Sequence, residues 1–385
     1  RLFTLQAISW QQANRQNRSC ALKAQELLDG IVERTEEPVA LMKGYNLALY
    51  AWSKSGSPES LQHAQSVFEN IKELNSTISK GEASSLFNAE TYCNMIHALS
   101  KLSLPVAPKQ AHKLLDEMVD LHSKHCFPSN SEPSLLAFNA VIATWAREGD
   151  GAMAERVLYQ LDNVAKDCQD LMSDVISYNS VLHAHLRTMN RDLALHRMKL
   201  LVDRMEDMQV DHPSVRPNAF TYVTLLKGFR QSHREDAALQ SERLLERVEG
   251  LWAMGDSTVK PDNRYYNMVI NAHAKSDNQF AAKRALAILE RMKSAIDSNC
   301  FPDVISYTSV IECLSKSVEA DAAEKAESLL NEAQEMYQET SDERLKPNMR
   351  TYTMTILTLA RCHGSPVRSR ALLEQLKDEY EASKD

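Results

Sequence analysis

Three kinds of side chain that can recognise a ligand recur in this sequence at intervals of 40 to 47 residues. They are amides and carboxylates, which form directional hydrogen bonds, and cations, which attract anions. The intervals are counted from an aromatic anchor, which occurs at Phe3, Tyr45, Tyr92, Phe138, Tyr178, Tyr222, Tyr266, Tyr307 and Tyr352. An ionised Asp only accepts hydrogen bonds, whereas an Asn amide also donates. Positions of this kind can therefore distinguish donors from acceptors on a ligand.

Two polar sets accompany the anchors. The first set follows the anchor by one residue and consists of Asn46, Cys93, Asn139, Asn179, Val223, Asn267, Thr308 and Thr353. The second set closes each repeat, usually after Pro, and consists of Asn88, Ser134, Asp174, Asn218, Asp262, Asp303 and Asn348. Asp or Asn ahead of a helix is also a preferred N-cap, because its side chain satisfies a free backbone N–H. Helix capping and ligand contact both suit the second set, and one side chain can serve both.

A cationic set follows the anchor by nine residues. It consists of Lys54, Lys101, Arg147, Arg187, Lys275, Lys316 and Arg361, with Gln12 and Gln231 as the exceptions. Residues one, five and nine places after the anchor lie on one face of a helix. The cations would therefore line the surface that carries the first polar set. A cation near a helix C-terminus also complements the helix dipole, which explains some of these positions but hardly all seven.

Two short amphipathic helices position these residues in each repeat. Around Tyr266, apolar residues recur at helical spacing on both sides of a polar break. Pro261 and Pro302 mark the two ends of this repeat, because Pro stops a helix. Two short helices cannot bury their apolar faces alone, but stacked copies can. The sequence therefore predicts an all-α fold, a right-handed α-solenoid superhelix of about nine helix-turn-helix repeats.

We expect these repeats to form a single solenoid domain. Their predicted ranges are 1–41, 42–88, 89–134, 135–174, 175–218, 219–262, 263–303, 304–348 and 349–385. The chain begins at Arg1 without Met, and we expect it to be an excerpt of a longer product. A targeting segment could then lie upstream.

Composition limits the possible functions. The net charge of −8 and the pI of about 5.9 argue mildly against a nucleic-acid partner, unless cations gather locally as the cationic set does. The seven Cys residues form no C-x-x-C pair, which predicts reduced thiols in an intracellular protein. No apolar run is long enough for a membrane span, so we expect no membrane insertion. The sequence has no P-loop, G-x-S-x-G or zinc-deaminase pattern, so no catalytic residue, metal site or cofactor is predicted.

The repeat resembles the pentatricopeptide repeat over essentially the whole chain. The resemblance is carried by an aromatic residue followed by Asn, two aliphatic residues and a small-residue patch, and by a Pro-Asp or Pro-Asn that closes the repeat. It is closest in residues 174–182 and 304–311. The repeats are longer than those of the family. Most gain three residues between the anchor and the Ala that begins the second helix, close to one helical turn, which keeps the apolar face in register. The rest of the excess lies at the end of the second helix and in its exit loop. Tetratricopeptide repeats place a Gly where this chain has Leu or Ile, and armadillo and HEAT repeats lack the Tyr-Asn start.

The resemblance implies a partner and a role for each set. Pentatricopeptide repeats bind single-stranded RNA, with one base read per repeat by two or three side chains. The base-reading pairs would be Asn46 with Asn88, Cys93 with Ser134, Asn139 with Asp174, Asn179 with Asn218, Val223 with Asp262, Asn267 with Asp303, and Thr308 with Asn348. Residues two places before the anchor would flank the bases: Lys43, Leu136, Ile176, Phe220, Arg264, Ile305 and Arg350, with Glu90 as the exception. The seven cations would form a phosphate track.

In this family, Asn after the anchor goes with pyrimidines and Thr with purines. The pairs then imply the order 5′-Y-n-U-Y-n-U-A-3′, where Y is a pyrimidine and n is unassigned. The family also implies a factor for RNA processing, stability or translation in a mitochondrion or plastid, with other RNA-processing proteins as further partners. The alternative is a protein-binding scaffold of tetratricopeptide type, which would lack the aligned cations. A third interpretation is an accessory arm for an enzymatic domain outside this chain.

Overall fold

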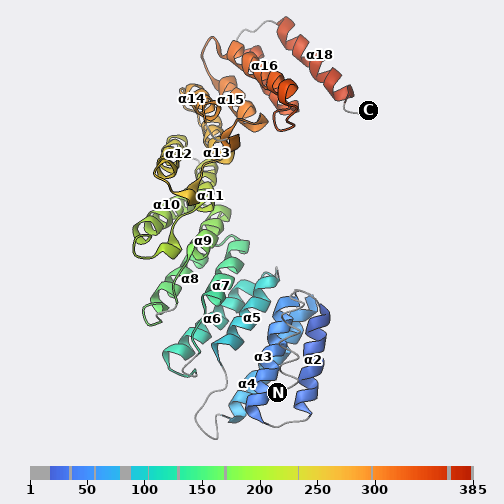
Figure 1. Ribbon diagram of the computed structural model, residues 1–385, viewed down its shortest axis with the longest axis vertical. Coiled ribbons are helices and arrows are strands. Elements are labelled where there is room, and N and C mark those ends of the chain that lie inside the picture. The colour runs from blue at the N-terminus through green and yellow to red at the C-terminus, as the bar shows by residue number, and fades with distance from the viewer. Residues whose placement is uncertain are drawn as a thin grey trace. The chain divides into compact units, whose positions relative to one another are not determined.

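A computed structural model shows the chain as helices joined by loops (Figure 1). It describes residues 18–33, 37–55, 58–78, 88–102, 104–127, 131–168, 171–232, 234–295, 298–361 and 366–382. Phe3, Gln12 and Cys362 lie outside these ranges, as does the predicted first helix of the first repeat. Within them, the regular elements are α-helices and three short 3-10 helices.

First and second helices of each repeat alternate along the chain. The first helices are α3 (Pro38–Ser55), α5 (Ala89–Lys101), α7 (Leu135–Glu148), α9 (Val175–Arg187), α11 (Ala219–Gln231), α13 (Asn263–Lys275), α15 (Val304–Lys316) and α17 (Met349–Arg361). The second helices are α2 (Arg18–Val32), α4 (Pro58–Ile78), α6 (Ala107–Ser123), α8 (Gly151–Val164), α10 (Arg191–Met208), α12 (Ala237–Ala253), α14 (Ala281–Lys293), α16 (Ala322–Thr340) and α18 (Pro366–Ala382). The 3-10 helices η1 (Pro213–Val215), η2 (Ser257–Val259) and η3 (Ser298–Cys300) lie in loops between repeats.

One helix starts earlier than predicted. The second repeat was expected to begin at residue 42, but α3 begins at Pro38. Proline suits the first turn of a helix, because the N–H that it lacks has no partner there and its fixed φ is already helical. The proline therefore starts this helix, whereas Pro261 and Pro302 precede the caps of α13 and α15.

The chain forms two compact units, and each is described by itself. The first contains residues 1–189 and 205–216, and the second contains residues 190–204 and 217–385. In the first unit α3, α5, α7 and α9 pack one against the next, and each contacts the second helix that precedes it. In the second unit α11, α13, α15 and α17 pack in the same way, and each contacts its own second helix. Packing between neighbours along the chain defines a solenoid, so the predicted all-α solenoid is confirmed.

The aromatic anchors are core residues. Tyr92, Phe138, Tyr178, Tyr222, Tyr266, Tyr307 and Tyr352 are all buried. The Tyr266 hydroxyl donates to Glu249 Oε1 at 2.8 Å, and the Tyr307 hydroxyl donates to Glu332 Oε1 at 2.9 Å. Burial and the carboxylate together raise the pKa of Tyr307, so its hydroxyl keeps the proton that it donates. These two rings thus contribute apolar area to the core while their hydroxyls are satisfied.

A recurring hydrogen bond joins successive repeats. It links the residue seven places after the anchor to the second helix of the preceding repeat. The pairs are Trp52 with Gln25 at 3.1 Å, Trp145 with His112 at 3.3 Å, His185 with Glu155 at 3.0 Å, and His273 with Glu242 at 3.2 Å. The His185 and Glu155 side chains are only 4% and 5% exposed. The sequence does not reveal these pairs, because their members lie 27 to 33 residues apart.

The described cysteines are free thiols. Cys168, Cys300 and Cys313 are buried, and Cys126 is exposed. No helix within the described ranges is both long and apolar enough to cross a membrane.

Candidate nucleic-acid interface

The second polar set marks the start of the first helices. The side chains of Asn88, Asp174, Asn218, Asp262 and Asp303 accept hydrogen bonds from backbone N–H groups in the first turns of α5, α9, α11, α13 and α15. Asn348 Oδ1 accepts from the N–H groups of Arg350 and Thr351 in α17. Ser134 occupies the N-cap position of α7, but its side chain makes no cap bond. The N-cap interpretation is therefore correct for every member of the set except Ser134.

The structure also brings predicted base-reading pairs into contact. Asn267 Nδ2 donates to both carboxylate oxygens of Asp303, at 3.1 and 3.2 Å. Asn139 Nδ2 lies 3.5 Å from Asp174 Oδ1, a long hydrogen bond of the same kind. In both cases the amide lies in one first helix and the carboxylate caps the next first helix. Two successive first helices thus contribute one polar site.

A hydroxyl one place before the anchor bridges these pairs. Ser306 Oγ donates to Asn267 Oδ1 at 2.6 Å and to Asp303 Oδ1 at 3.1 Å. The equivalent bridges are Ser177 between Asn139 and Asp174, Thr91 between Asn46 and Asn88, and Thr351 between Thr308 and Asn348. The sequence interpretation missed this hydroxyl. The signal for it is the recurrence of Ser or Thr before the anchor at Thr91, Ser177, Thr221, Ser306 and Thr351.

The pairs without Asp or Asn at both places differ. The Cys93 thiol lies 3.1 Å from the Ser134 hydroxyl, and burial raises the pKa of that thiol, which keeps it protonated. Val223 is buried and has no polar group to offer Asp262, whose carboxylate forms an ion pair with Arg264 at 2.6 Å. The structure therefore joins Cys93 to Ser134 but not Val223 to Asp262. Asn179 belongs to the first compact unit and Asn218 to the second, so each is described only as part of its own unit.

The apolar base-flanking residues lie on the surface. Leu136, Ile176, Phe220 and Ile305 are 58%, 60%, 53% and 54% exposed. Exposure of a large apolar side chain forgoes the favourable free energy of burial. The same position is exposed and apolar in four repeats, which suits contact with the flat face of a base.

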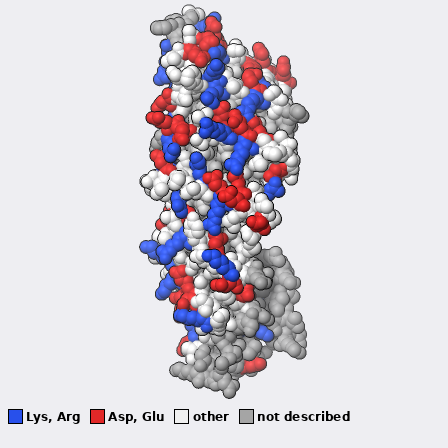
Figure 2. Space-filling view, turned by 90° about the vertical axis from the view of Figure 1, so that its left-hand side faces the viewer, with Lys and Arg blue, Asp and Glu red and all other residues white. Residues whose placement is uncertain are grey.

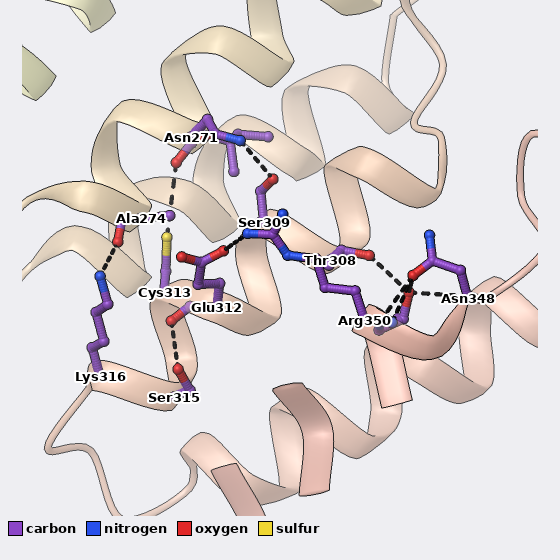
Figure 3. A network of polar contacts seen from close by, with 12 residues as sticks. Asn271, Ala274, Thr308, Ser309, Glu312, Cys313, Ser315, Lys316, Asn348 and Arg350 are labelled. Atoms are coloured by element: carbon purple, nitrogen blue, oxygen red, sulfur yellow. Dashed lines mark hydrogen bonds and ion pairs between the residues drawn. The ribbon is translucent and has the colours of Figure 1, made fainter. Parts of the chain in front are cut away.

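The two arginines at the base-flanking position are held by acids. Arg264 pairs with Asp262, the N-cap of its own helix, at 2.6 Å. Arg350 pairs with Glu312 of the preceding repeat at 2.7 Å, and both are drawn in Figure 3. A guanidinium that is already fixed in place offers a flat face at a low entropic cost. These residues keep the geometry required for stacking, but their charge is partly compensated.

Three members of the cationic set donate to the preceding repeat. The acceptors are backbone carbonyls near the end of its first helix: Arg147 donates to Ser100 and Leu102, Lys316 to Ala274 (Figure 3), and Arg361 to Ser315. The last carbonyls of a helix lack partners within the helix. These three cations therefore satisfy carbonyls at the end of a neighbouring first helix, which the sequence interpretation did not predict.

The other cations are placed differently. Lys101, Arg187 and Lys275 are exposed, and no hydrogen bond or ion pair holds them within the described part of the chain. Lys54 Nζ lies 3.0 Å from His97 Nε2. Burial lowers the pKa of His97 to about 4, and the charges of Lys54 and Lys101 add to this effect. His97 is therefore neutral at pH 7 and can accept a hydrogen bond from Lys54.

The second helices carry both signs of charge. On the side of the second unit where α12 and α14 are labelled in Figure 1, Figure 2 shows Lys and Arg interspersed with Asp and Glu. Acidic residues therefore form no continuous surface on that side of the second unit. Among the described residues, no group of three or more His, Cys, Asp or Glu side chains is placed to hold a metal ion.

Comparison with known proteins finds likeness only among solved structures. No protein-family model matches the chain, and no curated protein matches it. The crystal structure of the pentatricopeptide repeat protein PPR10 from maize is similar at 20% identity with a TM-score of 0.44, over 94% of this chain and 47% of that one. Two structures of PPR10 in complex with an 18-nt psaJ RNA element give 17% identity and a TM-score of 0.39. The chain spans about half the length of PPR10. With TM-scores below 0.5, the fold assignment rests on the helix packing within this chain.

Proposed function

We propose that this chain is a pentatricopeptide-type protein that binds single-stranded RNA and reads one base per repeat. The observation that carries the proposal is the contact between the first and second polar sets. Three predicted pairs touch directly, and two more are joined by a bridging hydroxyl. Capping alone requires only the second set, because an N-cap acts within its own helix. The presence of a polar partner from the preceding first helix favours a shared ligand site.

The surroundings of each pair support the same proposal. An Asp accepts from the ring N–H of uracil, whereas an Asn can donate to the bare ring nitrogen of cytosine or adenine. Exposed apolar side chains at the base-flanking position provide stacking surfaces, which contribute about 1–3 kcal/mol per base in single-strand binding. Lys101, Arg187 and Lys275 are free to contact phosphates. We therefore propose the reading order 5′-Y-n-U-Y-n-U-A-3′.

We further propose that the protein acts in a mitochondrion or plastid, in RNA processing, stability or translation, together with other RNA-processing proteins. The support for this is the resemblance of the repeats to the family. The tetratricopeptide-type scaffold is the alternative, and it predicts a peptide ligand and no preference among RNA sequences.

Selection from a random single-stranded RNA library tests the function directly. The purified chain should enrich RNAs that contain the proposed order, and duplexes of the same sequences should be retained weakly because their base edges are already paired. The matched control is the Asn139→Ala/Asn267→Ala variant, which keeps every helix cap. It should lose the two U positions and keep the others. Retention of no RNA above a protein-free control would refute the proposed function.

A further inference from the structure

A basic pocket lies within the second compact unit. Its volume is about 700 Å³, and it is lined by the ends of α11 and α13, the start of α12, and single residues of α10 and α15. The cationic side chains that line it are Arg191, Arg230, Arg234, Lys275 and Lys316, and the acidic ones are Glu235 and Asp277. The lining therefore has a net charge of +3, in a chain whose net charge is −8.

Two of the five cations are already engaged. Arg234 forms an ion pair with Asp236 at 3.0 Å, and burial of this pair is slight. Lys316 donates to the carbonyl of Ala274, as Figure 3 shows. These two side chains are held at the edge of the pocket by partners of their own.

The remaining cations, Arg191, Arg230 and Lys275, have no such partner. Within the described residues none of them makes a hydrogen bond or an ion pair, and Arg230 Nε is buried without an acceptor. All three line the same pocket. Burial lowers the pKa of Lys275, the charges of Arg230 and Arg191 lower it further, and the nearby Glu312 carboxylate opposes this effect. Like charges at close range repel one another. A buried guanidinium nitrogen without an acceptor is also costly.

Helix dipoles do not account for this cluster. Arg230 and Lys275 lie in the last turns of α11 and α13, where a cation is favourable. Arg191, however, is the first residue of α10, where the helix end carries partial positive charge and a cation is unfavourable. The three residues converge from three helices on one pocket, so an anion is what would relieve their repulsion.

We propose that this pocket binds a phosphate group, with Arg191 and Arg230 as the ligands and Lys275 as a supporting charge. The guanidinium fork matches two phosphate oxygens and forms strong charge-assisted hydrogen bonds. The cationic set has a gap in this repeat, because Gln231 stands nine places after the anchor Tyr222. The pocket supplies positive charge at that gap. If the proposed function holds, the phosphate is a backbone phosphate of the bound RNA; the other source of the same chemistry is a free phosphoanion.

The test compares two charge-matched double variants. Arg191→Gln/Arg230→Gln removes the two ligands, whereas Arg243→Gln/Lys283→Gln removes two exposed cations from the second helices α12 and α14. Affinity for single-stranded RNA is measured across a salt titration. The pocket variant should bind at least about tenfold more weakly at low salt. Its plot of log K against log salt should be shallower by about 0.7 for each phosphate that the variant no longer binds. The control should match the wild type.

A second arm titrates inorganic pyrophosphate into the same proteins by calorimetry. Loss of pyrophosphate binding in the pocket variant, with RNA affinity unchanged, supports the pocket and identifies a free phosphoanion as its ligand. Loss of RNA affinity with the shallower salt slope identifies the RNA backbone. If no protein binds RNA but the wild type binds pyrophosphate through these arginines, the proposed function fails and the pocket stands. If RNA affinity and salt slope are unchanged and pyrophosphate does not bind, the pocket proposal is wrong.

Folding of the variants is checked by thermal melting. Removal of like charges should leave the melting temperature unchanged or higher. If Arg191→Gln/Arg230→Gln melts early, Lys275→Gln takes its place, because Lys275 is exposed. It should reduce phosphate binding in the same direction by a smaller factor.

Discussion

Substitution of Asp303 separates helix capping from base reading. Its Oδ1 accepts from the N–H groups of Ile305 and Ser306, both at 3.0 Å. Its Oδ2 accepts from Asn263 Nδ2 at 3.0 Å, and Asn267 Nδ2 donates to both oxygens. An Asn at this position keeps one oxygen for the cap and replaces the other with a donor. Asp303→Asn therefore preserves the start of α15 while it changes the group offered to a base.

The expected magnitudes differ between Asn and Ala. Asp303→Ala removes the cap, at about 0.5–2 kcal/mol. It also leaves the buried Asn267 amide without its acceptor, at about 1–3 kcal/mol. We expect a total loss of about 2–4 kcal/mol in the free energy of unfolding. Asp303→Asn places an amide donor against the donors of Asn263 and Asn267. Rotation of those amides by 180° relieves this conflict, and we expect the free energy of unfolding to fall by about 1 kcal/mol. In RNA binding, the preference at one base should move from U toward C by about 1 kcal/mol.

Urea denaturation measures the first quantity, and fluorescence anisotropy with two RNAs that differ only in U or C measures the second. Asp150→Asn is the matched control. Asp150 caps α8 through a hydrogen bond from the Met153 N–H at 3.0 Å, but it belongs to no predicted pair. It should leave base preference unchanged. Equal weakening of U and C by Asp303→Asn, or a change confined to stability, would show that Asp303 is only a helix cap.

Three further predictions concern the cationic set and the buried pairs. Lys101→Gln should weaken binding to all RNAs and flatten the salt dependence by about 0.7 without lowering the free energy of unfolding. Arg147→Gln, by contrast, should lower the free energy of unfolding by about 1–2 kcal/mol in urea denaturation, because the carbonyls of the preceding helix lose the guanidinium that donates to them. His185→Leu removes the hydrogen bond between His185 and the buried Glu155 carboxylate, which keeps its bond from the Tyr159 hydroxyl. The variant should lose about 1–3 kcal/mol in the same assay, and Glu155→Leu in the same chain should restore most of that loss. The pKa of His97 is lowered to about 4 in the folded chain, so the unfolded chain binds the proton first as the pH falls. Stability should therefore decrease by about 2 kcal/mol, after solvent screening, as the pH drops from about 6.5 to about 4. His97→Gln should flatten the pH dependence of the urea midpoint over that range.

The helix pairs are predictable because their cause is local. Apolar residues at helical spacing identify each first helix, and Pro followed by Asp or Asn identifies where the next repeat begins. Asp303 illustrates this, because a residue that prefers the N-cap stands directly before the apolar run that starts at Val304. Pro38 shows the limit of the same rule. The sequence does not tell whether a Pro follows the end of one helix or lies in the first turn of the next, because only the backbone conformation distinguishes the two cases.

The partners of the cations are not predictable in this way. Lys101 and Arg147 occupy the same position relative to their anchors, yet only Arg147 donates to the preceding helix, through Ser100 and Leu102. The difference depends on the separation of two helices and on the reach of the side chain, and neither is written in the spacing. The bridging hydroxyls are similar. Ser and Thr are common in every class of segment, so Ser306 becomes informative only when its oxygen is placed between Asn267 and Asp303.

The geometry of the caps explains why capping and base reading can reside in one side chain. An N-cap residue stands where a first helix begins, and the first helices pack side by side, so the Asp303 cap meets the polar Asn267 of the preceding first helix. Partial positive charge at the helix N-terminus favours a negative side chain there. A carboxylate at this place accepts hydrogen bonds and donates none. Under the proposed function, a preference for U over C would follow from the requirement that also makes a carboxylate a good cap.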